Sequence, residues 1–295
     1  MKKAFYLSLI LILFVTGCQS QANTSCSNDH PLKYSTFPFR FSTADEQGKL
    51  IDRQIEFGPY LDVRAFINTC PDYNKMAGLT CLEVIYIDAN QCPDISNIYK
   101  FRNLKYVYIY PTLVVRSLMD VEARIDQLQS ITGVESIGKL RKLEQLEIRQ
   151  AELPDISFLQ NLKTLKVLSL TGNGVSDISP IADLTALEVL DLGGTQINDF
   201  TPLKKLVNLR YLNLDDTNFR NTSVLQGLNN LEYLRLTNTF VSWEDCQSLK
   251  NKLGNNSVLC ISPEECEQII QIRKNSSATP SEMNNRCEFE LMRKS

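Results

Sequence analysis

Three acidic side chains, Asp191, Asp215 and Asp216, are the residues best suited to chemistry, because together they could bind a divalent cation or supply a general acid and base. The single histidine, His30, argues against a His-based catalytic triad and against a multi-histidine zinc site. The sequence contains no phosphate-binding loop and no cluster with metal-ligand spacing. We therefore expect no cofactor and no enzymatic activity, and we interpret the three carboxylates as part of a solvated face.

The N-terminus carries an export signal. A basic start is followed by an apolar run from Ala4 to Val15, which is too short to be a convincing membrane span. Its end, VTGC at 15–18, resembles the lipobox of bacterial lipoproteins, which implies cleavage before Cys18 and a lipid anchor on that cysteine. An ordinary signal peptide with a chance cysteine is the alternative. The resemblance also implies that Gln19, after the cysteine, favours the outer membrane if the cell has one.

The rest of the chain has the composition of an ordinary globular protein, with 43% hydrophobic and 22% charged residues. Removal of Lys2 and Lys3 with the signal peptide leaves 29 basic against 34 acidic residues, a formal charge of about −5. This balance gives no electrostatic support for binding nucleic acid. The polar residues 18–33 are typical of a flexible tether.

Nine cysteines minus the lipidated Cys18 leave eight, an even number. In a chain exported to an oxidising compartment, an even number favours structural disulfides. The eight flank a cysteine-free stretch at 93–245, and they are Cys26, Cys70, Cys81, Cys92, Cys246, Cys260, Cys266 and Cys287.

A leucine recurs at intervals of 22 residues across the central stretch, at Leu143, Leu165, Leu187, Leu209 and Leu231. Each begins the same pattern, for example LEVLDLGGTQINDFTPLKKLVN at 187–208. The same step backward from Leu104 reaches Leu82 and Tyr60, and one irregular interval of 39 residues separates Leu104 from Leu143. The sequence therefore predicts about eight repeats.

The shared pattern, LxxLxLxxTxIxDIxxLxxL, resembles the 22-residue class of leucine-rich repeats, most closely the internalin-like proteins of bacteria. The resemblance implies an α/β solenoid, a right-handed superhelix with a parallel β-sheet on its concave face and 3₁₀ turns or short helices on its convex side. The physical argument agrees, because one repeat cannot bury its own leucines whereas stacked copies form a continuous core. The asparagine that usually follows the strand is mixed with threonine here, at Asn68, Asn90, Asn173, Thr195, Thr217 and Thr239.

The open ends of a solenoid require caps. Residues 34–59 alternate like strands and predict an N-terminal cap, and the C-terminal region contains helix starts at Ser242 and Ser262. The predicted domains are a signal peptide at 1–17, a lipidated tether at 18–33, an N-terminal cap at 34–59, repeats at 60–252 and a C-terminal cap at 253–295.

The cysteine clusters fall on the two predicted caps, so we expect disulfides to stabilise them. Equivalent positions in neighbouring coils lie about 4.8 Å apart, within the range of a disulfide. This spacing allows Cys70 with Cys92, which would leave Cys26 with Cys81, and other pairings stay open.

The segment LKYVYIYP at 104–111 alternates tyrosine with aliphatic residues, which is typical of a strand. In each repeat the first, fourth and sixth positions carry the core residues, so the third, fifth and seventh face the concave side. This register places Val107 and Ile109 in the core and Tyr106, Tyr108 and Tyr110 on the concave side. In the two preceding repeats the concave positions are Asp62, Arg64, Phe66, Val84, Tyr86 and Asp88.

Aromatic and charged side chains therefore gather on the predicted concave face. Surface tyrosines in such numbers are enriched at protein contacts, and together they would exceed the few hundred Å² of apolar patch that a monomer usually exposes. We predict a surface for a protein, with an envelope glycan as the second candidate, made of Phe66, Tyr86, Tyr106, Tyr108, Tyr110, Arg149, Asp191, Tyr211, Asp215, Tyr233 and Arg235.

The irregular interval contains an insertion at about residues 112–130. Its segment SLMDVEARIDQLQ, at 117–129, places Leu118, Val121, Ile125 and Leu128 on one face of a helix. Either this helix covers the tyrosines, which then extend the core, or the helix and the rings form two walls of a recognition groove.

Two functions are compatible with these patterns. The first is a non-enzymatic, lipid-anchored leucine-rich repeat protein of the bacterial cell envelope that binds a partner through its concave face. The second is a structural envelope lipoprotein without a specific ligand. The gathered tyrosines favour the first.

Overall fold

The computed structural model describes part of the 295-residue chain, namely residues 34–44, 50–61, 64–67, 83–89, 92–110, 130–254, 257–260 and 262. The predictions for the signal peptide, Cys18, the tether, the helix at 117–129 and the helix start at Ser262 fall mostly or wholly outside these residues. So do Asn68, Asn90, Cys26, Cys70, Cys81, Cys266 and Cys287.

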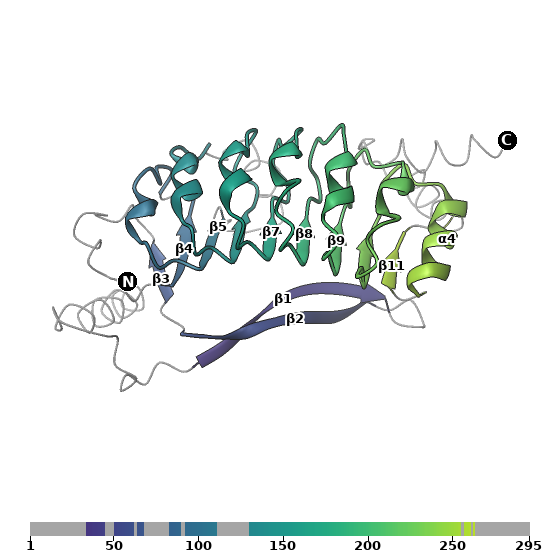
Figure 1. Cartoon of the computed structure of the whole chain (residues 1–295), viewed down its shortest axis with the longest axis horizontal. Coiled ribbons are helices and arrows are strands. Elements are labelled where there is room, and N and C mark those ends of the chain that lie inside the picture. Colours follow the sequence, from purple (N-terminus) through teal and green to yellow (C-terminus); the bar gives the residue numbers. More distant parts are fainter. Residues whose placement is uncertain are drawn as a thin grey trace, which may run out of the picture.

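Within the described residues, a parallel sheet of nine strands follows the chain order and does not close on itself (Figure 1). Each strand pairs in parallel with its neighbours in the sequence, which requires the chain to return to the same edge after every strand. The strands are β3 (Arg64–Ile67), β4 (Val84–Asp88), β5 (Tyr106–Tyr110), β6 (Gln145–Ile148), β7 (Val167–Ser169), β8 (Val189–Asp191), β9 (Tyr211–Asn213), β10 (Tyr233–Arg235) and β11 (Val258–Leu259).

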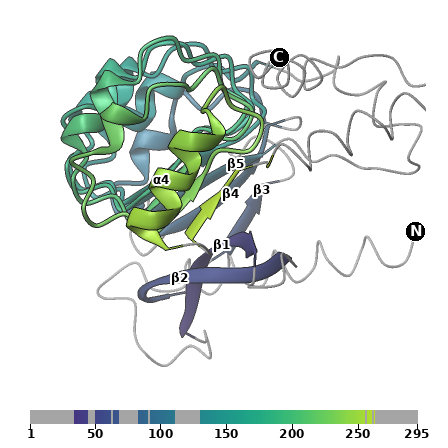
Figure 2. The ribbon, with the colours of Figure 1, turned by 90° about the vertical axis from the view of Figure 1, so that its right-hand side faces the viewer.

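A short 3₁₀ helix lies on the return path of each described coil from β4 to β10, on the side of the solenoid away from the strands (Figure 2). An aspartate two residues before the helix fixes the turn in three consecutive repeats, because its carboxylate accepts the backbone N–H. The N–H of Ser157 donates to Asp155 Oδ1 at 2.9 Å, that of Ser179 to Asp177 Oδ1 at 2.8 Å and that of Thr201 to Asp199 Oδ1 at 2.9 Å. The helices are η1 (Ile98–Lys100), η3 (Val134–Lys139), η4 (Ser157–Asn161), η5 (Ser179–Ile181), η6 (Thr201–Lys205) and η7 (Thr222–Leu225).

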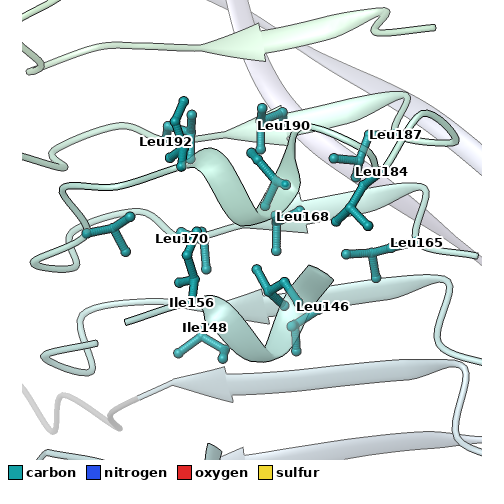
Figure 3. Packing of buried hydrophobic residues seen from close by; sticks show 14 of the residues in the cluster. Leu146, Ile148, Ile156, Leu165, Leu168, Leu170, Leu184, Leu187, Leu190 and Leu192 are labelled. Carbon is teal, nitrogen blue, oxygen red and sulfur yellow. The ribbon is translucent and has the colours of Figure 1, made fainter. Parts of the chain in front are cut away.

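The core is a continuous column of leucines and isoleucines between the strands and the 3₁₀ helices (Figure 3). Equivalent positions stack directly, as Leu146, Leu168 and Leu190 do, and all three are fully buried. The predicted assignment of the recurring leucines to the core is therefore confirmed for the described repeats.

Asn173 joins two neighbouring coils by hydrogen bonds to their backbones. Its Oδ1 accepts from the N–H of Ala151 at 3.0 Å and of Leu153 at 3.2 Å, both in the preceding coil. Its Nδ2 donates to the carbonyl of Ile148 at 2.7 Å and of Leu170 at 2.9 Å. One buried side chain therefore satisfies four backbone groups, which is why an amide is needed at this turn.

The threonines at the equivalent turns have a more local role. The hydroxyls of Thr195, Thr217 and Thr239 each donate to the carbonyl three residues earlier in their own coil, at 2.6 to 2.8 Å. At this turn, asparagine therefore links two neighbouring coils, whereas threonine forms a hydrogen bond within its own coil.

The register of the first strand differs from the predicted one. β3 pairs Arg64 with Val84 and Phe66 with Tyr86, a step of 20 residues, whereas a 22-residue step placed Asp62 opposite Val84. The observed register aligns Ile67 of β3 with Ile87, which is a core residue of β4. Phe66 therefore stands in the row of Tyr86, not in the row of Asp88.

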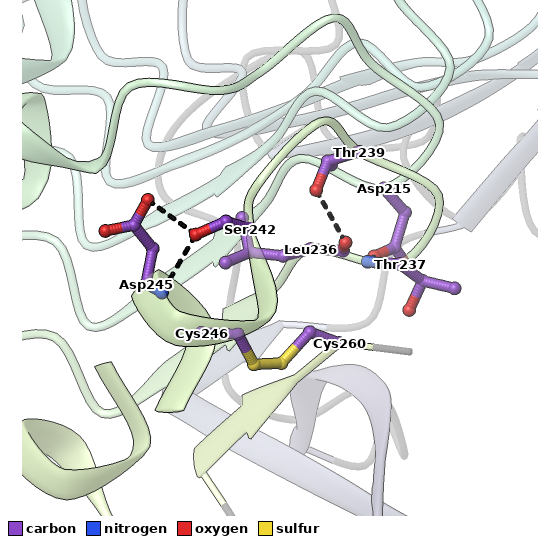
Figure 4. The surroundings of a disulfide bond; sticks show 8 residues. All are labelled: Asp215, Leu236, Thr237, Thr239, Ser242, Asp245, Cys246 and Cys260. Carbon is purple, nitrogen blue, oxygen red and sulfur yellow. Dashed lines mark hydrogen bonds between the residues drawn. A yellow bond between two sulfur atoms is a disulfide. The ribbon is translucent and has the colours of Figure 1, made fainter. Parts of the chain in front are cut away.

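The C-terminal end is closed by a helix and a short strand (Figure 4). Helix α4 (Trp243–Leu253) begins as predicted at Ser242, whose hydroxyl oxygen accepts the N–H of Asp245 at 3.1 Å. Strand β11 then pairs with β10, and a disulfide joins Cys246 of α4 to Cys260. The parallel sheet thus continues beyond residue 252, where the repeats were expected to end.

The described residues also bear on the predicted disulfides and on membrane-spanning helices. Cys92 is also disulfide-bonded, to a cysteine outside the described residues. None of the helices that the structure describes has the length and apolar character needed to cross a bilayer.

Residues 34–61 form a separate two-stranded sheet. Strand β1 (Tyr34–Ala44) pairs antiparallel with β2 (Leu50–Leu61), and neither strand joins the parallel sheet. Both views place this hairpin along the side of the solenoid that carries the strands, where it runs across them (Figures 1 and 2).

Candidate functional site

The predicted concave rows are observed from β4 to β10. Strand pairing aligns the third position of each repeat as Val84, Tyr106, Gln145, Val167, Val189, Tyr211 and Tyr233, and the fifth as Tyr86, Tyr108, Glu147, Ser169, Asp191, Asn213 and Arg235. Because alternate residues of a strand point to opposite faces, these side chains lie opposite the leucines. Their apolar members form two clusters separate from the leucine core.

Several of these aromatic residues are buried, although the sequence left their burial or exposure open. Tyr108 is 1% exposed, Tyr106 7% and Tyr211 2%, so these three rings are buried. Tyr86, Tyr110 and Tyr233 are half-buried. The concave side therefore does not present one open aromatic patch, because its rings are packed.

The tyrosine cluster consists of Val84, Tyr86, Tyr106, Tyr108 and Tyr110. The rings of Tyr86 and Tyr108 stack with centroids 4.5 Å apart and planes 9° apart. The ring of Tyr110 is tilted by 31° against that of Tyr108, at 6.3 Å. Such contacts between rings stabilise beyond the area that they bury, by about 0.5–1.5 kcal/mol each.

The carboxylate of Glu147 lies beside this cluster and accepts three side-chain hydrogen bonds. Tyr110 Oη donates to its Oε2 at 2.6 Å, and an Arg149 guanidinium nitrogen donates to the same oxygen at 2.8 Å. Gln145 Nε2 donates to Oε1 at 2.7 Å. A buried charge is tolerated when it is paired and hydrogen-bonded in this way, so Glu147 fixes Tyr110 and Arg149 in place.

This environment changes the titration of its members. Burial, and then the charge of Glu147, raises the pKa of Tyr110 above its ordinary value. Burial lowers the pKa of Arg149, but the charges of Glu147 and Asp191 favour the cation, and its pKa is raised. Tyr110 therefore remains a neutral donor and Arg149 a cation at any physiological pH.

A second polar group, the Asp191–Arg235 network, consists of Asp191, Asn213, Asp215 and Arg235. Asn213 Nδ2 donates to Asp191 Oδ1 at 2.8 Å, and Arg235 Nε donates to Asp215 Oδ2 at 2.6 Å. The N–H of Thr237 donates to Asp215 Oδ1 at 2.6 Å. Burial raises the pKa of Asp215 in spite of the neighbouring Arg235.

The interpretation of the carboxylates as a solvated face is wrong for two of the three. Asp191 and Asp215 are buried, and their oxygens accept the bonds described above. Asp216 is exposed and accepts from Asn238 Nδ2 at 2.7 Å. Within the described part of the chain, no group of three or more His, Cys, Asp or Glu side chains is arranged to hold a metal ion.

Sequence reasoning missed Gln145 and Glu147 as members of the site. The 22-residue register placed both on the concave side, and that position was the available signal. Their importance comes from bonds to Tyr110 and Arg149, which depend on side-chain geometry across two strands.

The raised tyrosine pKa values predict how stability changes at high pH. Burial raises the pKa of Tyr110 and of Tyr211, so the folded protein keeps protons that the unfolded chain loses near pH 10. Their contribution is fully present below about pH 10 and is lost as pH rises further, by up to about 1.4 kcal/mol per pH unit for each tyrosine. We expect the unfolding free energy of the Tyr110→Phe and Tyr211→Phe variants, measured by urea titration at a series of pH values, to fall less steeply above this pH. The same slope of unfolding free energy against pH as in the unaltered protein would contradict the prediction.

Comparison with known proteins gives a direct match for part of the repeats. The family model for two copies of leucine-rich repeats matches residues 163–205, which contain β7, β8 and the 3₁₀ helices after them. The chain folds as a leucine-rich repeat solenoid. The matched repeats are continuous in the sheet with those from β3 to β10, so the same architecture extends on both sides of the matched segment. No curated protein sequence matches the chain.

Solved structures similar to this leucine-rich repeat chain include bacterial proteins. Internalin C2 of Listeria monocytogenes is 26% identical, with 64% of this chain and 83% of that chain covered and a TM-score of 0.46. An internalin F of the same organism is 24% identical, with 65% and 64% covered and a TM-score of 0.42. A leucine-rich repeat protein of Leptospira interrogans is 21% identical, with 72% and 52% covered and a TM-score of 0.49.

Proposed function

We propose that this chain is an exported, lipid-anchored leucine-rich repeat protein that binds a protein partner along its concave side and has no catalytic activity. The export and the anchor at Cys18 rest on the sequence at 1–18. The binding role rests on the described concave surface, above all on two arginines that are held in place by buried carboxylates.

Arg149 and Arg235 share an arrangement that suits recognition. Each guanidinium is paired with a nearly buried carboxylate, Glu147 or Asp215, while the arginine side chains themselves remain 37% and 27% exposed. A side chain that is already fixed loses little entropy on binding, and arginine and tyrosine dominate the binding energy of protein interfaces. The two arginines are therefore already ordered before a partner binds them.

The spacing of Arg149 and Arg235 sets the distance between the two contacts that a partner must make. Arg149 directly follows β6 and Arg235 ends β10, and these two strands are four steps apart in the sheet, which corresponds to about 19 Å. Half-buried Tyr110 and Tyr233 lie beside the two arginines. A partner with two polar or acidic contacts at this separation, and with apolar surface beside them, fits this surface.

The described carboxylates support a non-enzymatic role. Both oxygens of Asp215 accept hydrogen bonds, from Arg235 and from the N–H of Thr237, and Asp191 Oδ1 accepts from Asn213 and from the N–H of Gly193. General acid and base catalysis needs a group that reaches substrate with a suitable proton affinity. Asp215, with both oxygens bonded within the protein, is poorly placed to act in this way.

The test is photo-cross-linking in intact cells from position 110, whose side chain is half-buried and borders Arg149. Position 108 is less suitable because Tyr108 is 1% exposed. We expect a cross-linked protein in the membrane fraction, and we expect Arg149→Ala and Arg235→Ala each to weaken its capture by roughly 30-fold, the effect of a 2 kcal/mol contact.

Arg141→Ala is the matched control, because Arg141 is exposed outside the concave rows. It should leave capture unchanged, and the unfolding midpoints of all three variants should be compared to exclude loss of the fold. Absence of any product above the uncross-linked control would favour the second candidate, a structural envelope lipoprotein without a specific ligand.

A further inference from the structure

Three apolar residues on the concave side are more deeply buried than an uncovered sheet face allows. Val167, Val189 and Tyr211 are 1%, 0% and 2% exposed, and they form a cluster apart from the leucine core. We call this cluster, with Tyr233 packed against it, the central strip. Because an apolar face of a sheet must be packed against another element to be buried, a further layer of protein has to cover the central strip.

The β1–β2 hairpin has one apolar and one polar face. In its register Phe37 pairs with Phe57, Phe39 with Ile55 and Phe41 with Arg53, so this face carries three phenylalanines of β1 and one charged residue of β2. The alternate pairs between and beyond them are mostly polar: Pro38 with Glu56, Arg40 with Gln54, and Ser42 with Asp52. Since alternate positions of a strand share a face, the aromatic pairs occupy one face and the polar pairs the other.

Such a hairpin needs a surface to pack on. A two-stranded sheet is marginally stable alone in water, and three or more strands or a packing partner are required. Neither β1 nor β2 is hydrogen-bonded to the parallel sheet, so its stability must come from packing of its apolar face.

Position and length both assign the hairpin to the concave side. Figures 1 and 2 place it along the strand side of the solenoid, across the parallel strands. Strand β1 has 11 residues and so spans about 36 Å, while the eight steps between β3 and β11 span about 38 Å. The hairpin is thus as long as the sheet is wide.

We propose that the apolar face of the β1–β2 hairpin is docked on the central strip and covers the concave side of the solenoid. The hairpin is then an intramolecular cover of the binding surface. Tyr211 and the valines become available to a partner when the hairpin is displaced, whereas Arg149 and Arg235 are partly exposed with the cover in place. A partner that needs the strip binds with an affinity reduced by the fraction of covered molecules. This consequence rests on the proposed function, and the docking itself does not.

The docking is tested in the full-length chain by a photo-cross-linking side chain. p-Benzoylphenylalanine in place of Phe39 keeps an aromatic group on the apolar face, and the same residue in place of Arg40 is the control on the polar face. We expect position 39 to yield an intramolecular cross-link to the peptides that contain Val167, Val189 or Tyr211, and position 40 to yield none. Equal yields from both positions, or none from position 39, would overturn the proposal.

A second measurement links the cover to binding. We expect Phe39→Asp to increase the rate of Tyr211 nitration several-fold and Arg40→Asp to leave it unchanged, measured at a temperature at which the repeats of both variants are folded. Capture of the partner should increase in Phe39→Asp. Faster nitration without increased capture would keep the docking and refute its regulatory role. Rapid nitration of Tyr211 in the unaltered chain would refute the docking and leave the proposed function intact.

Discussion

Replacement of Asn173 by alanine is expected to lower the free energy of unfolding by about 3 kcal/mol or more. The side chain satisfies the N–H groups of Ala151 and Leu153 and the carbonyls of Ile148 and Leu170, and all five residues are buried. A buried backbone group left without its partner costs about 1–3 kcal/mol, and water would replace some of the four bonds. The loss should appear as a lower midpoint in urea-induced unfolding with an unchanged slope.

Thr195→Val provides the matched comparison, one coil further along. Thr195 is equally buried but makes a single described side-chain bond, to the carbonyl of Leu192 at 2.6 Å. Valine has the same shape, so about 1 kcal/mol is expected. Equal losses for the two variants would show that Asn173 does not link the coils as its geometry indicates.

Replacement of Leu190 by alanine is expected to cost about 2–5 kcal/mol, because Leu190 is fully buried in the middle of the leucine column (Figure 3). In a solenoid each repeat contacts only its neighbours, so a local loss is not shared evenly by the whole chain. Hydrogen exchange should therefore accelerate most in β7, β8 and β9 and least in β4 and β5.

Gln196→Ala is the control for this variant, because Gln196 is exposed in the same repeat. It should change neither the unfolding midpoint nor the exchange pattern. Uniform acceleration across all strands after Leu190→Ala would mean that the repeats unfold as a single cooperative unit.

The 22-residue period is enough to predict the sheet register from β4 to β5 and from β6 to β10, and the recurrence of the same pattern at Leu143 sets the 39-residue step between β5 and β6. It works there because each repeat places leucines at the same core positions, so one strand determines the next. It fails at β3, where the pairing of Ile67 with Ile87 sets a shorter step. It also misses β11, which follows a helix and pairs Leu234 with Val258.

The repeat pattern could not predict that the tyrosines are buried. The period tells which residues face the concave side, but exposure depends on what packs against that side. On our proposal that element is the hairpin at 34–61, more than 100 residues before Val167 in the sequence. Likewise, the composition identified Asp215 as a candidate ligand, whereas only the structure shows Arg235 and the Thr237 N–H bound to it.

The short strand at the C-terminal end has a consequence for the behaviour of the protein at high concentration. A parallel sheet with a long free edge can add the sheet of another molecule by backbone pairing, and repeated addition would produce filaments. At this end the outermost strand, β11, has two residues, and it is tied to α4 through the Cys246–Cys260 disulfide. So few backbone groups cannot template another strand. The strand therefore acts as a stop to polymerisation at this end of the described sheet.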